Sequence, residues 1–97
     1  MSTTFIAKLI VKKGQEAELE RLQKELAKIT KGSEPDCLVY DFIRHRSEPQ
    51  TYVVYARFKD EAAFQAHMKA PFHDRLVPPI LASLAKEMDL QFFDCLA

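Results

Sequence analysis

Apolar and polar residues alternate in four separate stretches of this chain. Strict alternation places every second side chain on the same face of an extended backbone, so each stretch predicts a β-strand. The four predicted strands cover residues 3–12, 37–44, 51–58 and 88–95.

Between the strands, apolar residues recur every three or four positions, which is typical of helices. Residues 15–30 carry one such stripe, formed by Leu19, Leu22, Leu26 and Ile29, and Gly32 is a candidate stop. A second helix is predicted from Asp60, whose carboxylate can cap the first turn, to Lys69. Residues 72–86 predict a looser helical region, interrupted at Pro78–Pro79 or begun afresh with Pro79 in a first turn.

The predicted order is strand, helix, strand, strand, helix, strand, in a single domain over residues 1–97. This order defines the α+β, ferredoxin-like βαββαβ arrangement, with a four-stranded antiparallel sheet and both helices on one face.

Both faces of the predicted sheet carry apolar rows, although the helices can cover only one of them. One row consists of Phe5, Leu9, Tyr40, Phe42, Tyr52, Val54 and Phe92. The other consists of Ile6, Ile10, Val39, Ile43, Val53, Tyr55 and Phe93. We therefore expect the uncovered face to pack against a second copy of the chain, which gives a homodimer through the sheet.

Charge and composition exclude several classes of function. The 14 basic and 14 acidic residues balance to a net charge of zero, so no basic surface for nucleic acid is expected. No apolar run is long enough to span a membrane, and residues 1–13 resemble a strand and not a signal peptide, which indicates the cytoplasm. Cys37 and Cys95 have neither zinc-site nor CxxC spacing and are expected to be reduced.

The most informative candidate for chemistry is His67. It shares one face of the second helix with Phe64 and Met68, which places an imidazole among apolar side chains. His67 is either a base for a bound substrate or a buried histidine that bonds a backbone carbonyl. His67 and His73 do not have the spacing of a metal-binding pair, so no metal is expected.

Further candidates surround this histidine in the predicted fold. Tyr40 offers a phenol that either takes part in chemistry or satisfies a backbone group. His73 follows a proline turn and is either a surface residue or part of the pocket wall, whereas His45 is expected to be solvated. The apolar walls of a pocket, or equally the core, are predicted to consist of Phe58, Phe64, Met68 and Phe72. With only two glycines and no glycine-rich loop, a nucleotide or flavin cofactor is not expected.

Several of these segments together resemble the antibiotic biosynthesis monooxygenase-like domain family. The resemblance rests on Pro35, on the Cys37–Asp41 segment CLVYD, on the segment YVVYARFKDEAAFQAH from Tyr52, and on the aromatic residue after Pro71. Members form dimeric α+β barrels and include cofactor-independent oxygenases of aromatic phenols and quinols. Close relatives degrade haem or isomerise a phosphorylated sugar.

The resemblance implies that His67 assists deprotonation of a small phenol or quinol, which then reacts with dioxygen without a cofactor. Two departures stand out. Ala56 occupies a position where the family usually has Glu, and Phe72 precedes His73, the reverse of the usual order. The chain also lacks the Trp that the haem-degrading branch uses.

Two alternatives to the oxygenase remain open from the residues. An isomerase of a small phosphorylated metabolite would require Arg44, Arg57 or Arg75 to converge on one pocket. A non-catalytic dimeric binding module is the other alternative, since the usual carboxylate is replaced by Ala56.

Overall fold

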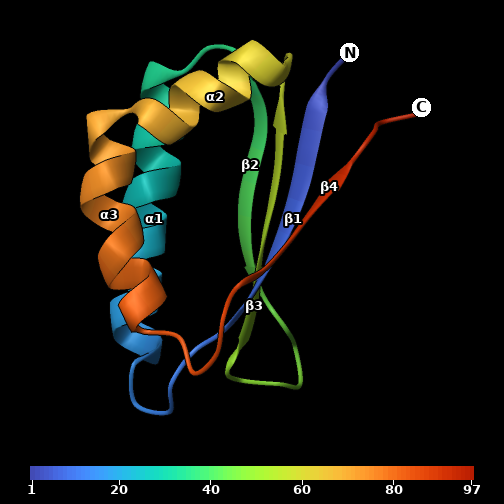
Figure 1. Ribbon diagram of the computed structural model, residues 1–97. Coiled ribbons are helices and arrows are strands. Elements are labelled where there is room, and N and C mark those ends of the chain that lie inside the picture. Colours follow the sequence, from blue (N-terminus) through green and yellow to red (C-terminus); the bar gives the residue numbers. More distant parts are fainter.

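A computed structural model describes residues 1–97, with four strands and three helices (Figure 1). The strands are β1 (Thr3–Ile10), β2 (Cys37–Arg44), β3 (Thr51–Phe58) and β4 (Asp89–Phe93). The helices are α1 (Glu16–Ser33), α2 (Glu61–Lys69) and α3 (Pro71–Ala82). Along the chain they follow the order β1, α1, β2, β3, α2, α3, β4.

The strands form one antiparallel sheet in the spatial order β2-β3-β1-β4. All three helices lie on one side of the sheet, with α1 and α3 next to each other and α2 crossing near one end (Figure 1). The predicted ferredoxin-like α+β class is therefore confirmed, and the second helical unit consists of two helices. None of the helices combines the length and apolar character that a membrane crossing requires.

Strict alternation of burial along β3 shows which face the helices cover. Tyr52, Val54, Ala56 and Phe58 are buried on the inner face, while the residues between them are only partly covered. Phe5, Ala7 and Leu9 continue this inner face on β1. The opposite, outer face keeps a row of partly exposed apolar side chains: Ile6, Ile10, Val39, Ile43, Val53, Tyr55 and Phe93.

The apolar stripe of α1 packs as predicted. Leu19, Leu22 and Leu26 are all buried in the hydrophobic core. The predicted stop at Gly32 is wrong, since α1 continues to Ser33. Gly32 does not adopt the left-handed conformation of a typical helix stop. Instead, the backbone N–H of Glu34 bonds the Thr30 carbonyl and closes the helix.

The turn between α2 and α3 follows from one proline. Asp60 caps α2 as predicted by accepting a hydrogen bond from the Ala63 backbone N–H at 2.8 Å. Ala70 is extended, the conformation that a following proline favours, so α2 ends there. Pro71 then starts α3, where its missing N–H costs nothing.

A helix starting at Pro79 is the second incorrect prediction. Pro78 and Pro79 lie inside α3, which runs unbroken from Pro71 to Ala82. Two prolines remove two backbone donors near the end of the helix. Leu76 and Ile80 are buried beside them, and this burial holds the segment in helical form.

Candidate active site

A cavity of about 210 Å³ lies between the helices and the inner face of the sheet. Almost all of its wall is apolar, with floor residues such as Ala7, Leu9 and Val54 from the sheet. The polar side chains in the wall come from four different elements. They are Gln23 of α1, Tyr40 of β2, His67 of α2 and His73 of α3.

His67 is 2% exposed and is held by a carboxylate. Its Nδ1 lies 2.8 Å from Oε1 of Glu34, the residue that follows α1. An ionised carboxylate can only accept a hydrogen bond, so Nδ1 carries the proton and donates it. In this tautomer the other ring nitrogen, Nε2, carries no proton and can accept one. The pair therefore has the arrangement of a histidine base and its orienting carboxylate.

Aromatic rings surround this imidazole and fix its position. The ring centre of Phe58 lies 5.0 Å from that of His67, and those of Tyr40 and Phe72 lie at 5.9 and 6.1 Å. The ring centre of His73 is nearer still, at 4.9 Å and almost perpendicular. A side chain packed on so many sides has little rotational freedom, which preorganises it for a bound substrate.

Tyr40 is neutral in this setting. Burial raises the pKa of its phenol, because the phenolate would lose its hydration. Nε2 of Gln23 donates a hydrogen bond to the Tyr40 oxygen at 3.0 Å. The hydroxyl of Tyr40 thereby keeps its own proton available for an acceptor in the cavity.

His73 is the second imidazole of the cavity wall. Its burial, and next the neighbouring His67, lower the pKa of His73 below its ordinary value. His73 is therefore predominantly neutral at neutral pH and adds a polar but uncharged group to the cavity. His45, in contrast, is exposed beside the β2–β3 connection.

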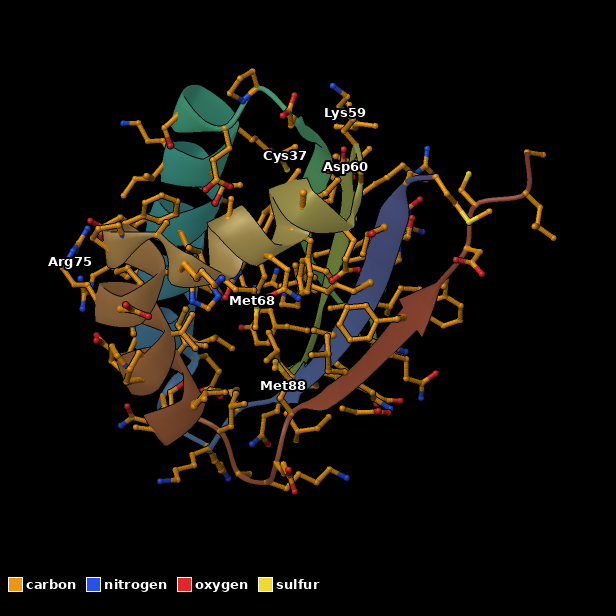
Figure 2. The ribbon with its side chains drawn as sticks, turned by 45° about the horizontal axis from the view of Figure 1, so that its top comes forward. Cys37, Lys59, Asp60, Met68, Arg75 and Met88 are labelled. Atoms are coloured by element: carbon orange, nitrogen blue, oxygen red, sulfur yellow. The ribbon has the colours of Figure 1, made fainter.

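The structure brings five of the seven predicted site residues to the cavity wall: Tyr40, Phe64, His67, Met68 and His73. Met68 lies on the side of α2 that faces the sheet (Figure 2). Phe58 and Phe72 do not line the cavity, but their rings pack against His67.

The three arginines considered for an anion do not converge. Arg44 pairs with Glu20, Arg75 pairs with Glu25 on the outside of the helix layer, and Arg57 bonds the Tyr55 hydroxyl on the outer sheet face. Figure 2 shows Arg75 pointing away from the sheet. None of the three lines the cavity.

Cys37 also lies outside the cavity. Burial raises the pKa of its thiol to about 11, so the thiolate that would act as a nucleophile is scarce.

Sequence reasoning missed two residues of the site. Gln23 occupies the buried face of α1 between Leu19 and Leu26, and a polar residue in such a stripe was a usable signal. Glu34 gave no signal, because 33 positions separate it from His67 and only the tertiary fold brings them together. This glutamate supplies a carboxylate to His67, whereas Ala56 stands at the β3 position where the resemblance implied a Glu.

Comparison with known proteins agrees with this fold. The model of the family described as antibiotic biosynthesis monooxygenase matches residues 3–78, so the chain belongs to this family. No curated protein has significant sequence similarity to the chain.

Solved structures resemble the whole chain. One described as an antibiotic biosynthesis monooxygenase is 27% identical, with a TM-score of 0.90, over 98% of this chain and 99% of its own. A Caulobacter crescentus protein with a provisional name of the same kind is 24% identical, with a TM-score of 0.93, over 99% of this chain and 91% of its own. A conserved protein of Methanosarcina mazei is 22% identical, with a TM-score of 0.90, over 96% and 91%. The Caulobacter and Methanosarcina proteins are only 24% and 22% identical to this chain, so their similarity shows the fold alone.

Proposed function

We propose that this protein is a cofactor-independent monooxygenase that oxidises a small aromatic phenol or quinol with dioxygen. One observation carries the proposal: a largely apolar cavity has a histidine in its wall that a carboxylate orients as a base. The substrate ring would occupy the apolar part, and its hydroxyl would meet His67 and Tyr40.

The reaction begins with a proton transfer. Nε2 of His67 takes the proton of the substrate hydroxyl, and Glu34 stabilises the imidazolium that forms. The Tyr40 hydroxyl donates a hydrogen bond to the substrate oxygen, which stabilises its negative charge. Apolar walls keep water away from the electron-rich anion.

The anion then reduces dioxygen. A ring carbon that is ortho or para to the phenolate oxygen and carries a hydrogen bonds one oxygen atom, and the other oxygen atom takes the proton back from His67, which gives a hydroperoxide. That carbon next loses its hydrogen as a proton while the O–O bond breaks and hydroxide leaves. The products are a quinone and water, so phenol and dioxygen supply every atom and electron.

The cavity also bears on the two alternatives. An isomerase of a phosphorylated metabolite needs cations at the phosphate, whereas Arg44, Arg57 and Arg75 all lie outside the cavity. A binding module requires no oriented base, whereas His67 has Glu34 at hydrogen-bond distance. Both observations favour the oxygenase.

Oxygen uptake with a panel of phenols, quinols and anthrols tests the proposal. We expect oxygen uptake with wild type to exceed the uncatalysed rate. His67→Ala should lower this rate enhancement at least tenfold, which corresponds to an increase of about 1.4 kcal/mol in activation free energy. His45→Ala removes an exposed histidine and serves as the matched control, with uptake unchanged. Absence of any enhancement by wild type would exclude the oxygenase, and enhancement that survives His67→Ala would exclude His67 as its base.

We further propose that the protein is a homodimer through the outer sheet face. Ile43 and Phe93 of the apolar row are 51% and 45% exposed in a single chain. On the same face, the buried atoms Thr4 Oγ1 and Arg57 Nε have no hydrogen-bond partner within the chain. Exposed apolar rows of this kind mark association surfaces.

Light scattering tests the dimer. We expect wild type at micromolar concentration to have twice the 11.2 kDa mass of one chain. Ile43→Asp should shift the population to monomer, because it places a charge in the apolar interface. Leu81→Asp, a substitution at an exposed residue of α3 on the opposite side of the sheet, should leave the mass unchanged. A monomeric wild type would contradict the proposal.

We also propose that the protein is cytoplasmic. Cys37 and Cys95 are both unpaired in the fold, and unpaired thiols suit a reducing compartment. Thiol titration of the native protein with a chromogenic disulfide, before and after reduction, tests whether either cysteine is oxidised when the protein is purified.

A further inference from the structure

The cavity extends across the sheet from one edge strand to the other. Its buried polar end lies at β2, where Tyr40 is 3% exposed, and its wall extends to Leu90 on β4. β2 and β4 are the two edge strands, with β3 and β1 between them. Neighbouring strands are about 4.8 Å apart, so three strand spacings separate the two ends by about 14 Å.

The β4 end of the cavity is the accessible end. Leu81 of α3, Leu90 of β4 and Met68 of α2 line the cavity, and they are 44%, 38% and 42% exposed. Tyr40, Gln23 and His67 at the other end are 2–3% exposed. A molecule that places its hydroxyl at His67 therefore has its opposite end at an apolar opening.

A second hollow lies beside this opening. It has a volume of about 530 Å³ and is lined by Leu81, Leu84, Lys86, Glu87, Met88 and Leu90. Leu81, Met88 and Leu90 belong to the walls of both hollows, so the two hollows lie side by side at the accessible end of the cavity. Met88 lies just before the start of β4 (Figure 2). We call this second hollow the α3–β4 groove.

Size limits what the inner cavity can hold. An apolar protein cavity of about 150 Å³ holds one benzene molecule. The inner cavity, of about 210 Å³, therefore fits a small ring system, and any larger substituent has to extend through the opening. The wall of the α3–β4 groove beside the opening is apolar, so it favours hydrocarbon over charged or strongly hydrated groups.

We propose that the substrate is an amphipathic phenol or quinol whose hydrocarbon chain leaves the cavity between Leu81 and Leu90 and lies in the α3–β4 groove. The proposal rests on the proposed function for the position of the hydroxyl. It adds a binding site for the chain and a substrate class: one small ring with an alkyl or alkenyl substituent on the side opposite the hydroxyl.

Binding of 4-alkylphenols with chains of one to eight carbons tests the proposal by calorimetry, without any turnover. We expect the dissociation constant for wild type to fall about twofold to fourfold per added methylene once the chain enters the groove. The double variant Leu81→Gln, Leu90→Thr should flatten this dependence, which is measured for each protein relative to its own affinity for 4-methylphenol. Both residues are already partly exposed, which makes the variant compatible with folding.

Leu38→Gln is the matched control, since Leu38 is 57% exposed and lies far from the groove on the opposite edge strand. Its chain-length dependence should equal that of wild type. An equal dependence in wild type and the double variant, or an affinity that does not rise with chain length, would overturn the groove proposal alone. If no phenol of any length binds to wild type, the proposed function fails and this inference fails with it.

Discussion

Glu34→Gln is expected to lower kcat for oxygen uptake about a hundredfold and to leave KM nearly unchanged. The carboxylate holds the proton on Nδ1 of His67 and stabilises the imidazolium that forms during turnover. A neutral amide removes that charge, and its NH2 group can donate to Nδ1, which would move the imidazole proton to Nε2. Stopped-flow oxygen uptake under saturating substrate measures kcat separately from KM.

A tautomer measurement separates this role from simple loss of structure. Nitrogen NMR of the His67 ring should show Nδ1 protonated in wild type and a changed tautomer population in Glu34→Gln. The matched control is Glu48→Gln, because Glu48 pairs with the exposed His45 at 3.7 Å. This control should retain kcat. A Glu34→Gln enzyme with wild-type kcat and an unchanged tautomer would exclude Glu34 as a positioning residue.

Ala7→Ile should close the cavity from its floor. Ala7 is 2% exposed, lines the cavity and pairs with Val54 and Leu90 across the sheet. A larger side chain there occupies the space of the substrate ring, so we expect phenol affinity to fall at least tenfold, about 1.4 kcal/mol. Isoleucine suits a strand and fills empty space, so the free energy of unfolding should change by less than about 1.5 kcal/mol.

Leu19→Ala is the control for Ala7→Ile, because it should lower stability and leave ligand binding unchanged. Leu19 is fully buried in α1 and does not line the cavity. Its truncation should cost about 2–5 kcal/mol of unfolding free energy by leaving a void, while the folded fraction retains ligand affinity. Calorimetric ligand titration and chemical denaturation measure the two quantities. Unchanged phenol binding by a folded Ala7→Ile protein would show that the ring binds elsewhere.

The fold was largely predictable because its signals are local. Alternation of side chains identified all four strands, and the Leu19–Leu22–Leu26 stripe identified α1. Two helix limits were predicted wrongly for one reason: Gly32 and Pro79 weaken a helix by themselves, but both lie in helices whose other residues are buried by tertiary packing. β4 is shorter than predicted, since regular pairing with β1 covers only Asp89–Phe93.

The candidate site was predictable only in part. His67 could be placed on a buried face from its spacing to Phe64, and both residues are buried. His73 could not be assigned from the sequence, because its burial depends on how α3 turns back after Pro71. The cavity itself arises where side chains of helices and sheet fail to fill the space between them, and no local pattern encodes such a gap.

The sequence by itself determined the class of fold, the face of each element that is buried, and the candidate histidine, because these depend on periods of two and 3.6 residues along one segment. Only the tertiary structure decided that Glu34 orients His67, that Gln23 bonds Tyr40, and that the cavity opens beside β4. Each of these features joins residues from different elements, and their distances are set by packing of the whole domain.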